Sequence, residues 1–231
     1  MIEDTIMKLK EFFSIKKLGP IEDYIGCTVE RLGKNKALLS QPPLLTHLRQ
    51  KFGDKVKNLK DYATPAAPGM SVVRLKEDFP KLSKQMQTEF RSAIGMLLYL
   101  IKHSRPDISN ATRELAKVMD GATMKDWKEL MRLVKFTLDT EHWKLKFYPI
   151  CENGLWTIVA YSDSDFAGDK EKRHSITGYI IFVCGVPVAW KSRGQKSVTL
   201  SSTEAEYVAL SETTCEILFI KQIMEFLDMK I

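Results

Sequence analysis

The stretch VAYSDSDFAGD, residues 159–169, begins with the apolar alternation of a β-strand and ends in carboxylates at Asp163, Asp165 and Asp169. Aspartate is disfavoured in strands, and the carboxylates at 163 and 165 would lie on one face if the strand continued. A buried strand that ends in acid has two interpretations, a solvated polar turn or a site for a positively charged ligand. These residues alone leave both open.

The residues around this stretch predict a small antiparallel sheet. Residues 155–163, 176–184 and 186–192 have strand-like patterns, and Gly185 lies in the tight turn between the last two. The middle strand, ITGYIIFVC, is apolar on both faces, so both faces of the sheet should be covered.

A long helix is expected over residues 201–229, SSTEAEYVALSETTCEILFIKQIMEFLDM. Its second half, from Ile217 to Leu227, is apolar almost all round, a pattern that needs packing partners on more than one side. The sequence ends soon afterwards at Ile231, so we expect a domain that is cut short and a sheet with an uncovered edge. Such surfaces favour self-association.

Upstream of the sheet, the pattern is mainly helical. The expected elements are, in order, a helix (3–13), two short antiparallel strands (24–41), a helix from Pro42 to Gly53, an extended connection (54–85) and three helices with apolar stripes (90–101, 106–121 and 123–138). Gly53 is expected to stop its helix, and Thr123 with Asp126 to cap the last one. Together with the sheet, these elements predict a mixed α+β fold.

The composition is that of an ordinary soluble, intracellular protein. The 231 residues carry a net charge of +6 and a pI of about 9.0, which mildly favours a polyanionic partner. The four cysteines lie far apart without a C-x-x-C pair, which argues against zinc and against a disulfide framework and fits reduced thiols. The sequence shows no signal peptide and no apolar run of membrane-spanning length.

Two acids near the start of the long helix have a structural and a functional interpretation. Ser201-x-x-Glu204 and Thr203-x-x-Glu206 each fit a capping box, and acids in a first turn favour the helix dipole. Alternatively, they lie within reach of Asp163 and share a divalent cation with it, because Mg²⁺ prefers carboxylate oxygens. Spacing alone favours capping.

Four linked motifs are more specific than any of these patterns. They are AYSDSDFAGD, SITGY, AWKSRGQK and SSTEAEY. In this order and at these intervals they closely resemble the ribonuclease H domain of copia-type LTR retrotransposon Pol polyproteins. Upstream segments such as FFSIKKLGPIEDYIGCTVER and FRSAIGMLLYLIKHSRPDI look like the end of the same family's reverse transcriptase.

The resemblance implies three domains. Residues 1–60 correspond to the end of the reverse transcriptase palm, with a primer-grip-like segment, and to the start of the thumb. Residues 61–150 correspond to a helical thumb and connection. Residues 151–231 correspond to the N-terminal part of a truncated ribonuclease H domain, with three antiparallel strands and one long helix.

The resemblance also implies a nuclease site. Asp163 matches the family's first catalytic aspartate and Glu206 its catalytic glutamate, whereas Glu204 is assigned to capping. In the implied mechanism, carboxylates hold two Mg²⁺ ions. One ion activates a water that attacks a phosphodiester of the RNA strand in an RNA–DNA hybrid, and the other stabilises the leaving 3′-oxygen.

Basic and polar residues are further candidates for contact with the hybrid. Those in the segment WKSRGQK are Lys191, Arg193, Gln195 and Lys196. They suit contacts to phosphates or sugars, although a solvated loop fits equally well. Lys16 and Lys17 lie beside the primer-grip resemblance, where a plain charged surface is the simpler interpretation.

Two features of the family are missing from the sequence. It has no Tyr-x-Asp-Asp motif, so no polymerase active site, and no Cys-Asp-Asn segment that would carry a third catalytic aspartate. With only Asp163 and Glu206, two Mg²⁺ ions would lack about half of their protein ligands. We therefore expect a ribonuclease by family that is weak or inactive as this chain. The alternative is a non-catalytic protein that binds nucleic acid or docks onto a polymerase.

The resemblance also gives partners and a location. The expected partners are an RNA–DNA hybrid and the remainder of the Pol polyprotein, with no membrane involved. The expected location is the cytoplasm, within a virus-like particle, the nucleus, or both.

Overall fold

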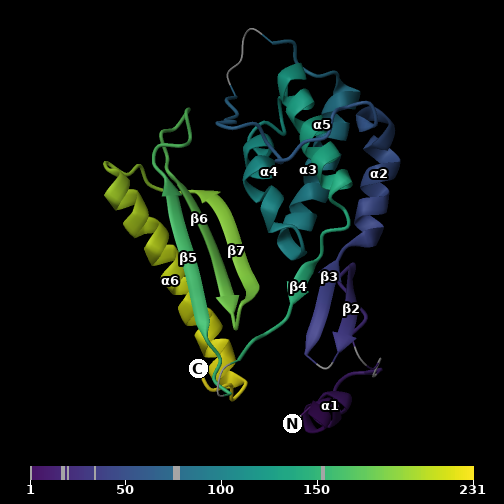
Figure 1. Ribbon diagram of the computed structural model, residues 1–231, viewed down its shortest axis with the longest axis vertical. Helices are drawn as coiled ribbons and strands as arrows, with labels where there is room; N and C mark the ends of the chain where they lie inside the picture. The colour runs from purple at the N-terminus through teal and green to yellow at the C-terminus, as the bar shows by residue number, and fades with distance from the viewer. Residues whose placement is uncertain (1, 17–18, 20, 34, 75–78, 152–153) are drawn as a thin grey trace.

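The computed structural model describes residues 2–16, 19, 21–33, 35–74, 79–151 and 154–231. Within these residues the chain forms two bodies (Figure 1): a helical body with a small sheet at one end, and a three-stranded sheet backed by one long helix. The mixed α+β class expected from the sequence is confirmed. None of the helices in this described part is long and apolar enough to cross a membrane.

The small sheet is antiparallel throughout and has the strand order β1-β2-β3-β4. Its strands are β1 (Asp23–Tyr24), β2 (Cys27–Gly33), β3 (Lys36–Ser40) and β4 (Leu145–Phe147), and α1 (Ile2–Lys10) precedes them. The hairpin of β2 and β3 is expected from the sequence. Strands β1 and β4 are not, because two or three residues are too few to show an alternation. Since β4 pairs with β3, the chain returns to this sheet after the helical body.

The helical body consists of α2 (Pro42–Val56), α3 (Lys84–His103), the short 3-10 helix η1 (Pro106–Ile108), α4 (Ser109–Ala116) and α5 (Met124–Asp139). Their apolar stripes meet in one core, in which Leu48, Phe90, Leu97 and Leu130 have no solvent exposure. Burial of each such side chain stabilises the fold by about 1.5–3 kcal/mol. The core extends from Leu45 to Leu138, so the expected division at residue 60 falls between helices that share it.

Local signals decide where these helices begin and end. Thr123 and Asp126 form the expected capping box at the start of α5. The expectation that Gly53 stops α2 is wrong, since the helix continues to Val56. Phe52 and Val56 are both buried in the core. Their burial outweighs the cost of about 1 kcal/mol for a glycine inside a helix.

The second sheet has the strand order β5-β6-β7 and is also antiparallel. Its strands are β5 (Ile158–Asp165), β6 (Ile176–Val183) and β7 (Val186–Gly194), and α6 (Ser202–Phe226) packs along β5 and β6. The three strands and the long helix confirm the sequence expectation. Because β6 is central, β5 forms one edge of the sheet.

The expectation that both faces of this sheet are covered holds in part, because the face opposite α6 is covered over β7 but open over β5, where Tyr161 is 64% exposed. Helix α6 covers one face, where Ala205 is fully buried. On the other face, the indole N–H of Trp190 donates to the Ile101 carbonyl in α3 (2.7 Å). Arg113 of α4 donates to the hydroxyl of Ser192 in β7 (3.2 Å). The helical body therefore lies against the β7 side of the sheet (Figure 1).

The outer side of α6 exposes large apolar side chains. Phe226 is 86% exposed and Phe219 is 56% exposed. This surface agrees with the apolar pattern that runs almost all round the second half of the helix. Self-association through it stays a prediction.

Candidate functional site

Strand β5 divides its side chains between the two faces of the sheet. Ser162 and Ser164 are half-buried on the face toward α6, whereas Asp163 and Asp165 are exposed on the opposite face. Asp163 pairs with Gly178 of β6, which has no side chain to crowd the carboxylate. The two strand-end acids therefore share the face that looks toward the helical body.

A cavity of about 440 Å³ lies on this face, between the sheet and the helical body. The sheet side is formed mainly by Tyr161, Asp163, Asp165, Gly178, Trp190 and Ser192. The helical side is formed by η1 and the start of α4, with Asp107 and Asn110. Asp163 thus lies in a partly polar cleft to which both bodies contribute.

Glu206 reaches the same part of β5 from the other direction. Its Oε1 atom accepts a hydrogen bond from the backbone N–H of Ser164 (3.2 Å). Within the described residues no strand pairs with the outer edge of β5, which leaves backbone groups available to side chains. The N–H belongs to the peptide group that joins Asp163 to Ser164, whose Cα atoms are about 3.8 Å apart. Asp163 and Glu206 therefore approach one peptide group from opposite faces of the strand.

The two glutamates in the first turns of α6, Glu204 and Glu206, have different roles. The Ser201 hydroxyl accepts the N–H of Glu204 (3.1 Å), and the Glu204 carboxylate accepts the N–H of Leu200 (2.7 Å). Glu204 therefore caps the helix, as the sequence interpretation assigns it. The second capping box does not form, because Thr203 already lies inside α6 and Glu206 bonds to β5 instead.

Two carboxylates lie near this edge, that of Asp163 on the face toward the helical body and that of Glu206 on the face toward α6. In the described part of the chain, no group of three or more His, Cys, Asp or Glu side chains gathers closely enough to hold a metal ion. The Ser164 hydroxyl, on the residue that Glu206 contacts, is buried without a hydrogen-bond partner. Mg²⁺ requires octahedral oxygen coordination, and two-ion centres use several carboxylates. Asp163 and Glu206 alone do not fit a complete two-ion centre.

The turn after β5 explains the glycine of the opening motif. A Cβ atom at Gly168 would lie 2.2 Å from Oδ2 of Asp165, so a larger residue would displace that carboxylate. The Gly168 N–H donates to the Asp165 carbonyl (3.2 Å), and the Ala167 N–H donates to the Ser175 hydroxyl (3.1 Å). Asp165 is therefore part of a closely packed turn.

Asp169, the last acid of the motif, is fixed to the helical body. Its carboxylate accepts the backbone N–H groups of Glu171 and Lys172, both at 3.0 Å, and lies 3.3 Å from Nζ of Lys117. Burial acts to raise the pKa of this carboxyl, but the two N–H donors and the Lys117 ammonium outweigh burial, and the pKa is lowered. The ionised carboxylate therefore ties the turn to α4.

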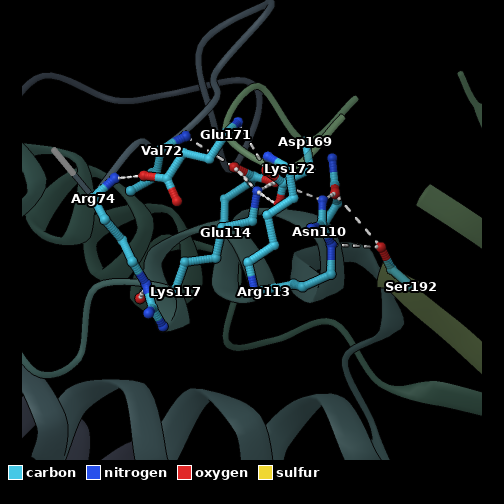
Figure 2. A network of polar contacts seen from close by, with 10 residues as sticks. All are labelled: Val72, Arg74, Asn110, Arg113, Glu114, Lys117, Asp169, Glu171, Lys172 and Ser192. Carbon is cyan, nitrogen blue, oxygen red and sulfur yellow. Dashed lines mark hydrogen bonds and ion pairs between the residues drawn. The ribbon is translucent and has the colours of Figure 1, made fainter. Parts of the chain in front are cut away.

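Figure 2 shows the wider network in which Lys117 lies. The buried carboxylate of Glu114 accepts the N–H of Val72 (2.8 Å) and pairs with Arg113 (2.6 Å) and Lys117 (2.9 Å). Glu171 adds a contact from the same turn to the backbone of Arg74. The sequence does not predict this network, because Arg113, Glu114 and Lys117 resemble the charged residues of an ordinary solvated helix face. Its effect is that the helical body holds the turn that follows β5.

Two side chains of the segment at the end of β7, Arg193 and Gln195, are engaged within the fold. Arg193 donates two hydrogen bonds to Glu212 of α6 (2.6 and 3.1 Å), which raise the pKa of the guanidinium. Gln195 is buried, and its amide donates to the Ala205 carbonyl (2.9 Å). This corrects the expectation for Gln195, whose amide joins the segment to α6 and is not presented to a hybrid.

The other basic candidates are at the surface. Lys191 is exposed, with its Nζ 5.9 Å from the centre of the Tyr179 ring, and Lys196 is exposed beyond β7. Lys16 is exposed as well, whereas Lys17 lies outside the described residues. Contact of these side chains with nucleic acid stays a prediction.

Comparisons with known proteins find similar sequences among transposon proteins. The chain is 30% identical over 235 residues to the retrovirus-related Pol polyprotein from transposon TNT 1-94 of Nicotiana tabacum, which covers 96% of this chain. It is 30% identical over 218 residues to an uncharacterized mitochondrial protein of Arabidopsis thaliana, covering 94% of this chain and 85% of that protein. It is also 39% identical over 127 residues to secreted RxLR effector protein 161 of Plasmopara viticola, covering 55% of this chain and 87% of the effector.

The similarity has a defined extent. The chain spans 16% of the length of the tobacco Pol polyprotein. No protein-family model matches the sequence, and no solved structure matches the chain. The linked motifs around Asp163 and Glu206 nevertheless agree with a similarity that extends over nearly every residue. The chain belongs to the retrovirus-related, copia-type Pol polyprotein family of LTR retrotransposons.

Proposed function

We propose that this chain is the segment of a retrotransposon Pol polyprotein in which reverse transcriptase passes into ribonuclease H. In this proposal the small sheet and the helical body are the end of the palm, the thumb and the connection. The second sheet and α6 are the N-terminal part of the ribonuclease H domain. The substrate class is the RNA strand of an RNA–DNA hybrid.

The contact between Glu206 and the Ser164 N–H carries this proposal. It brings the acid of α6 to the peptide group that follows Asp163, although a whole hairpin separates the two residues in sequence. If Glu204 and Glu206 were both caps, neither would reach β5. A cation site for phosphodiester chemistry uses carboxylates from separate elements, and here Asp163 on β5 and Glu206 on α6 lie on either side of one peptide group.

Only two residues, Asp163 and Glu206, are candidates for cation ligands in this proposal. Asp163 and Glu206 would offer carboxylate oxygens to Mg²⁺, which supplies Lewis acidity for phosphodiester hydrolysis when it is bound. The two residues do not fit a complete two-ion centre, so they do not account for a hydrolytic step on their own. We propose that the chain by itself binds a hybrid and cleaves it weakly or not at all.

Partners and location follow from the same proposal. The remainder of the Pol polyprotein is the protein partner, and the hybrid is the nucleic-acid partner. The site of action is where the hybrid is made, in a cytoplasmic virus-like particle or in the nucleus.

Fluorescence anisotropy with a labelled RNA–DNA hybrid tests the substrate class. We expect binding that weakens steeply when salt is raised, because phosphate contacts release counterions. Lys196→Gln should weaken binding, whereas Lys57→Gln at the end of α2 should not. Failure to bind the hybrid even at low salt would contradict the proposal.

A cleavage assay on the same hybrid with Mg²⁺ tests the limited catalytic role. We expect no cleavage above background, with the wild type and Asp163→Asn alike. Robust cleavage that Asp163→Asn abolishes would support the site and refute the claim that the chain is catalytically incomplete.

The donor set also favours a second candidate, a non-catalytic protein that binds nucleic acid or docks onto a polymerase. The favouring observation is that the described residues bring no third ligand to the two carboxylates. The effect of Mg²⁺ on hybrid binding separates the two functions. In a nuclease site Mg²⁺ strengthens binding by the wild type and not by Glu206→Gln, whereas in a binding protein it weakens both equally by screening.

A further inference from the structure

Two cysteines that are far apart in the sequence meet in the fold. The Sγ atoms of Cys151 and Cys184 are 2.8 Å apart. Cys151 is exposed in the segment between β4 and β5, and Cys184 is 2% exposed in the turn between β6 and β7. The sequence gives no sign of this pair, because the two residues lie on different elements with no motif to connect them.

Backbone hydrogen bonds hold the two cysteine-bearing segments together. The Ile150 N–H donates to the Cys184 carbonyl (3.0 Å), and the Cys184 N–H donates to the Thr157 carbonyl (2.9 Å). Cys184 itself has a φ of 48°, which shapes the turn toward the incoming segment. Main-chain hydrogen bonds therefore hold the two cysteines close together. The contact between the sulfur atoms does not depend on the rotamer of one side chain alone.

The other two cysteines provide a contrast within the same chain. Cys27 is buried in β2, and Cys215 is exposed on α6. No hydrogen bond or disulfide joins either of them to another cysteine in the described part of the chain. In an oxidation experiment, Cys215 is therefore the control for an exposed thiol without a neighbouring cysteine. Cys27 is the control for a buried thiol.

We propose that Cys151 and Cys184 form an oxidisable dithiol that closes into an intrachain disulfide with a low-molecular-weight disulfide such as oxidised glutathione. The Cys151 thiolate attacks one sulfur of the oxidant, which forms a mixed disulfide and releases one glutathione thiolate. The Cys184 thiolate then attacks Sγ of Cys151 and expels the second glutathione. Two electrons pass to the oxidant, and the two thiol protons end on the two glutathione molecules.

Exposure sets the order of these steps. Of the two paired cysteines, Cys151 is exposed to an oxidant in solution, whereas Cys184 is buried with its Sγ against Sγ of Cys151. The disulfide ties the segment that leads into β5 to the turn between β6 and β7. It closes a loop that contains β5 and β6, which restricts the unfolded chain more than the folded one.

The test uses the reduced full-length chain, treated with oxidised glutathione and analysed by peptide mass spectrometry without reduction. We expect a linked pair of peptides containing Cys151 and Cys184 that has lost two hydrogen atoms. Cys215 should carry a glutathione adduct, and Cys27 should remain a free thiol. Closure should raise the melting temperature by roughly 5 °C or more relative to the reduced chain.

Two variants make each step visible. Cys184→Ser should trap glutathione on Cys151 as a stable adduct, because the second thiol is missing. Cys151→Ser changes an exposed side chain, so it should fold normally and leave Cys184 unmodified. A persistent Cys151 adduct in the wild type, or Cys184 modified equally with and without Cys151, would overturn the proposal. So would crosslinks that form only between chains.

Discussion

The two bodies of this molecule bury apolar surface in different ways. The helical body encloses its own core, in which Phe90, Leu97 and Leu130 have no exposure. The sheet with α6 buries Ile181 and Ala205 between its layers but leaves apolar side chains exposed along the outer side of the helix. One body therefore draws its stability from its own core, whereas the other depends more on its neighbours.

The candidate site also depends on both bodies. Asp163 faces a cavity whose far wall is the helical body, so its surroundings depend on how the two bodies pack. Glu206 reaches the free edge of β5 from a helix that belongs to the same body. The geometry of the site is thus a property of the pair of bodies and not of the β5–α6 unit alone.

The largest expected effect on stability comes from an apolar residue in the closed core, in contrast to one on the exposed side of α6. Leu97→Ala should destabilise the protein by about 2–5 kcal/mol, because it leaves a cavity in a closed core. Leu218→Ala, at a leucine that is 52% exposed on α6, should change stability by no more than about 0.5 kcal/mol. Urea unfolding measures both, and equal losses would refute the contrast.

Removal of the buried Glu114 carboxylate in α4 should have the next largest effect. Glu114→Gln leaves Arg113 and Lys117 without their buried anion and should cost about 1–3 kcal/mol. Glu212→Gln is the matched control, because its partner Arg193 is more accessible to water, and it should cost about 1 kcal/mol or less. The account of the network fails if the two losses are equal.

A smaller effect is expected in the turn after β5. Gly168→Ala places a methyl group on the Asp165 carboxylate and should cost about 1–2 kcal/mol. At Gly178 an added Cβ would meet its nearest atom only at 3.9 Å, so Gly178→Ala should be almost neutral. Thermal unfolding of both variants is the measurement, and a neutral Gly168→Ala would show that the turn is not tightly packed.

The smallest effect concerns pH. The pKa of Asp169 is lowered in the folded state, so its stabilisation is present above the unfolded-state value of about 4. It is lost as the pH falls through the folded-state pKa. Asp169→Asn should therefore reduce the loss of stability between about pH 5 and pH 2 by less than about 1 kcal/mol. Asp54→Asn, at an exposed pair on α2, is the control for the loss of a surface carboxylate.

Sequence patterns were informative where many residues repeat one signal. The strands of the second sheet, the long helix and the capping box of Thr123 are visible as periodicity or as local spacing, because each depends on neighbours in the chain. The pairing of β4 with β3 and the meeting of Cys151 with Cys184 depend on tertiary packing, which leaves no local pattern. The continuation of α2 past Gly53 has the same origin, since the burial of Val56 sustains the helix.

The candidate site shows the same limit. The motifs identified Asp163 and Glu206, and the capping role of Glu204 followed from its spacing to Ser201. That Gln195 is buried under α6, and that α4 holds the turn after β5, required the packing of separate elements. These features arise from contacts between residues that no short segment contains.

Paramagnetic Mn²⁺ added to the isotope-labelled chain tests the central claim most directly, because it locates a divalent cation by broadening nearby amide signals. We expect selective broadening of Ser164 and its neighbours in β5 and at the start of α6. Asp163→Asn or Glu206→Gln should abolish it, and Glu204→Gln should leave it intact. Broadening centred elsewhere, or retained when Asp163 and Glu206 are both replaced, would contradict a shared cation site at the edge of β5.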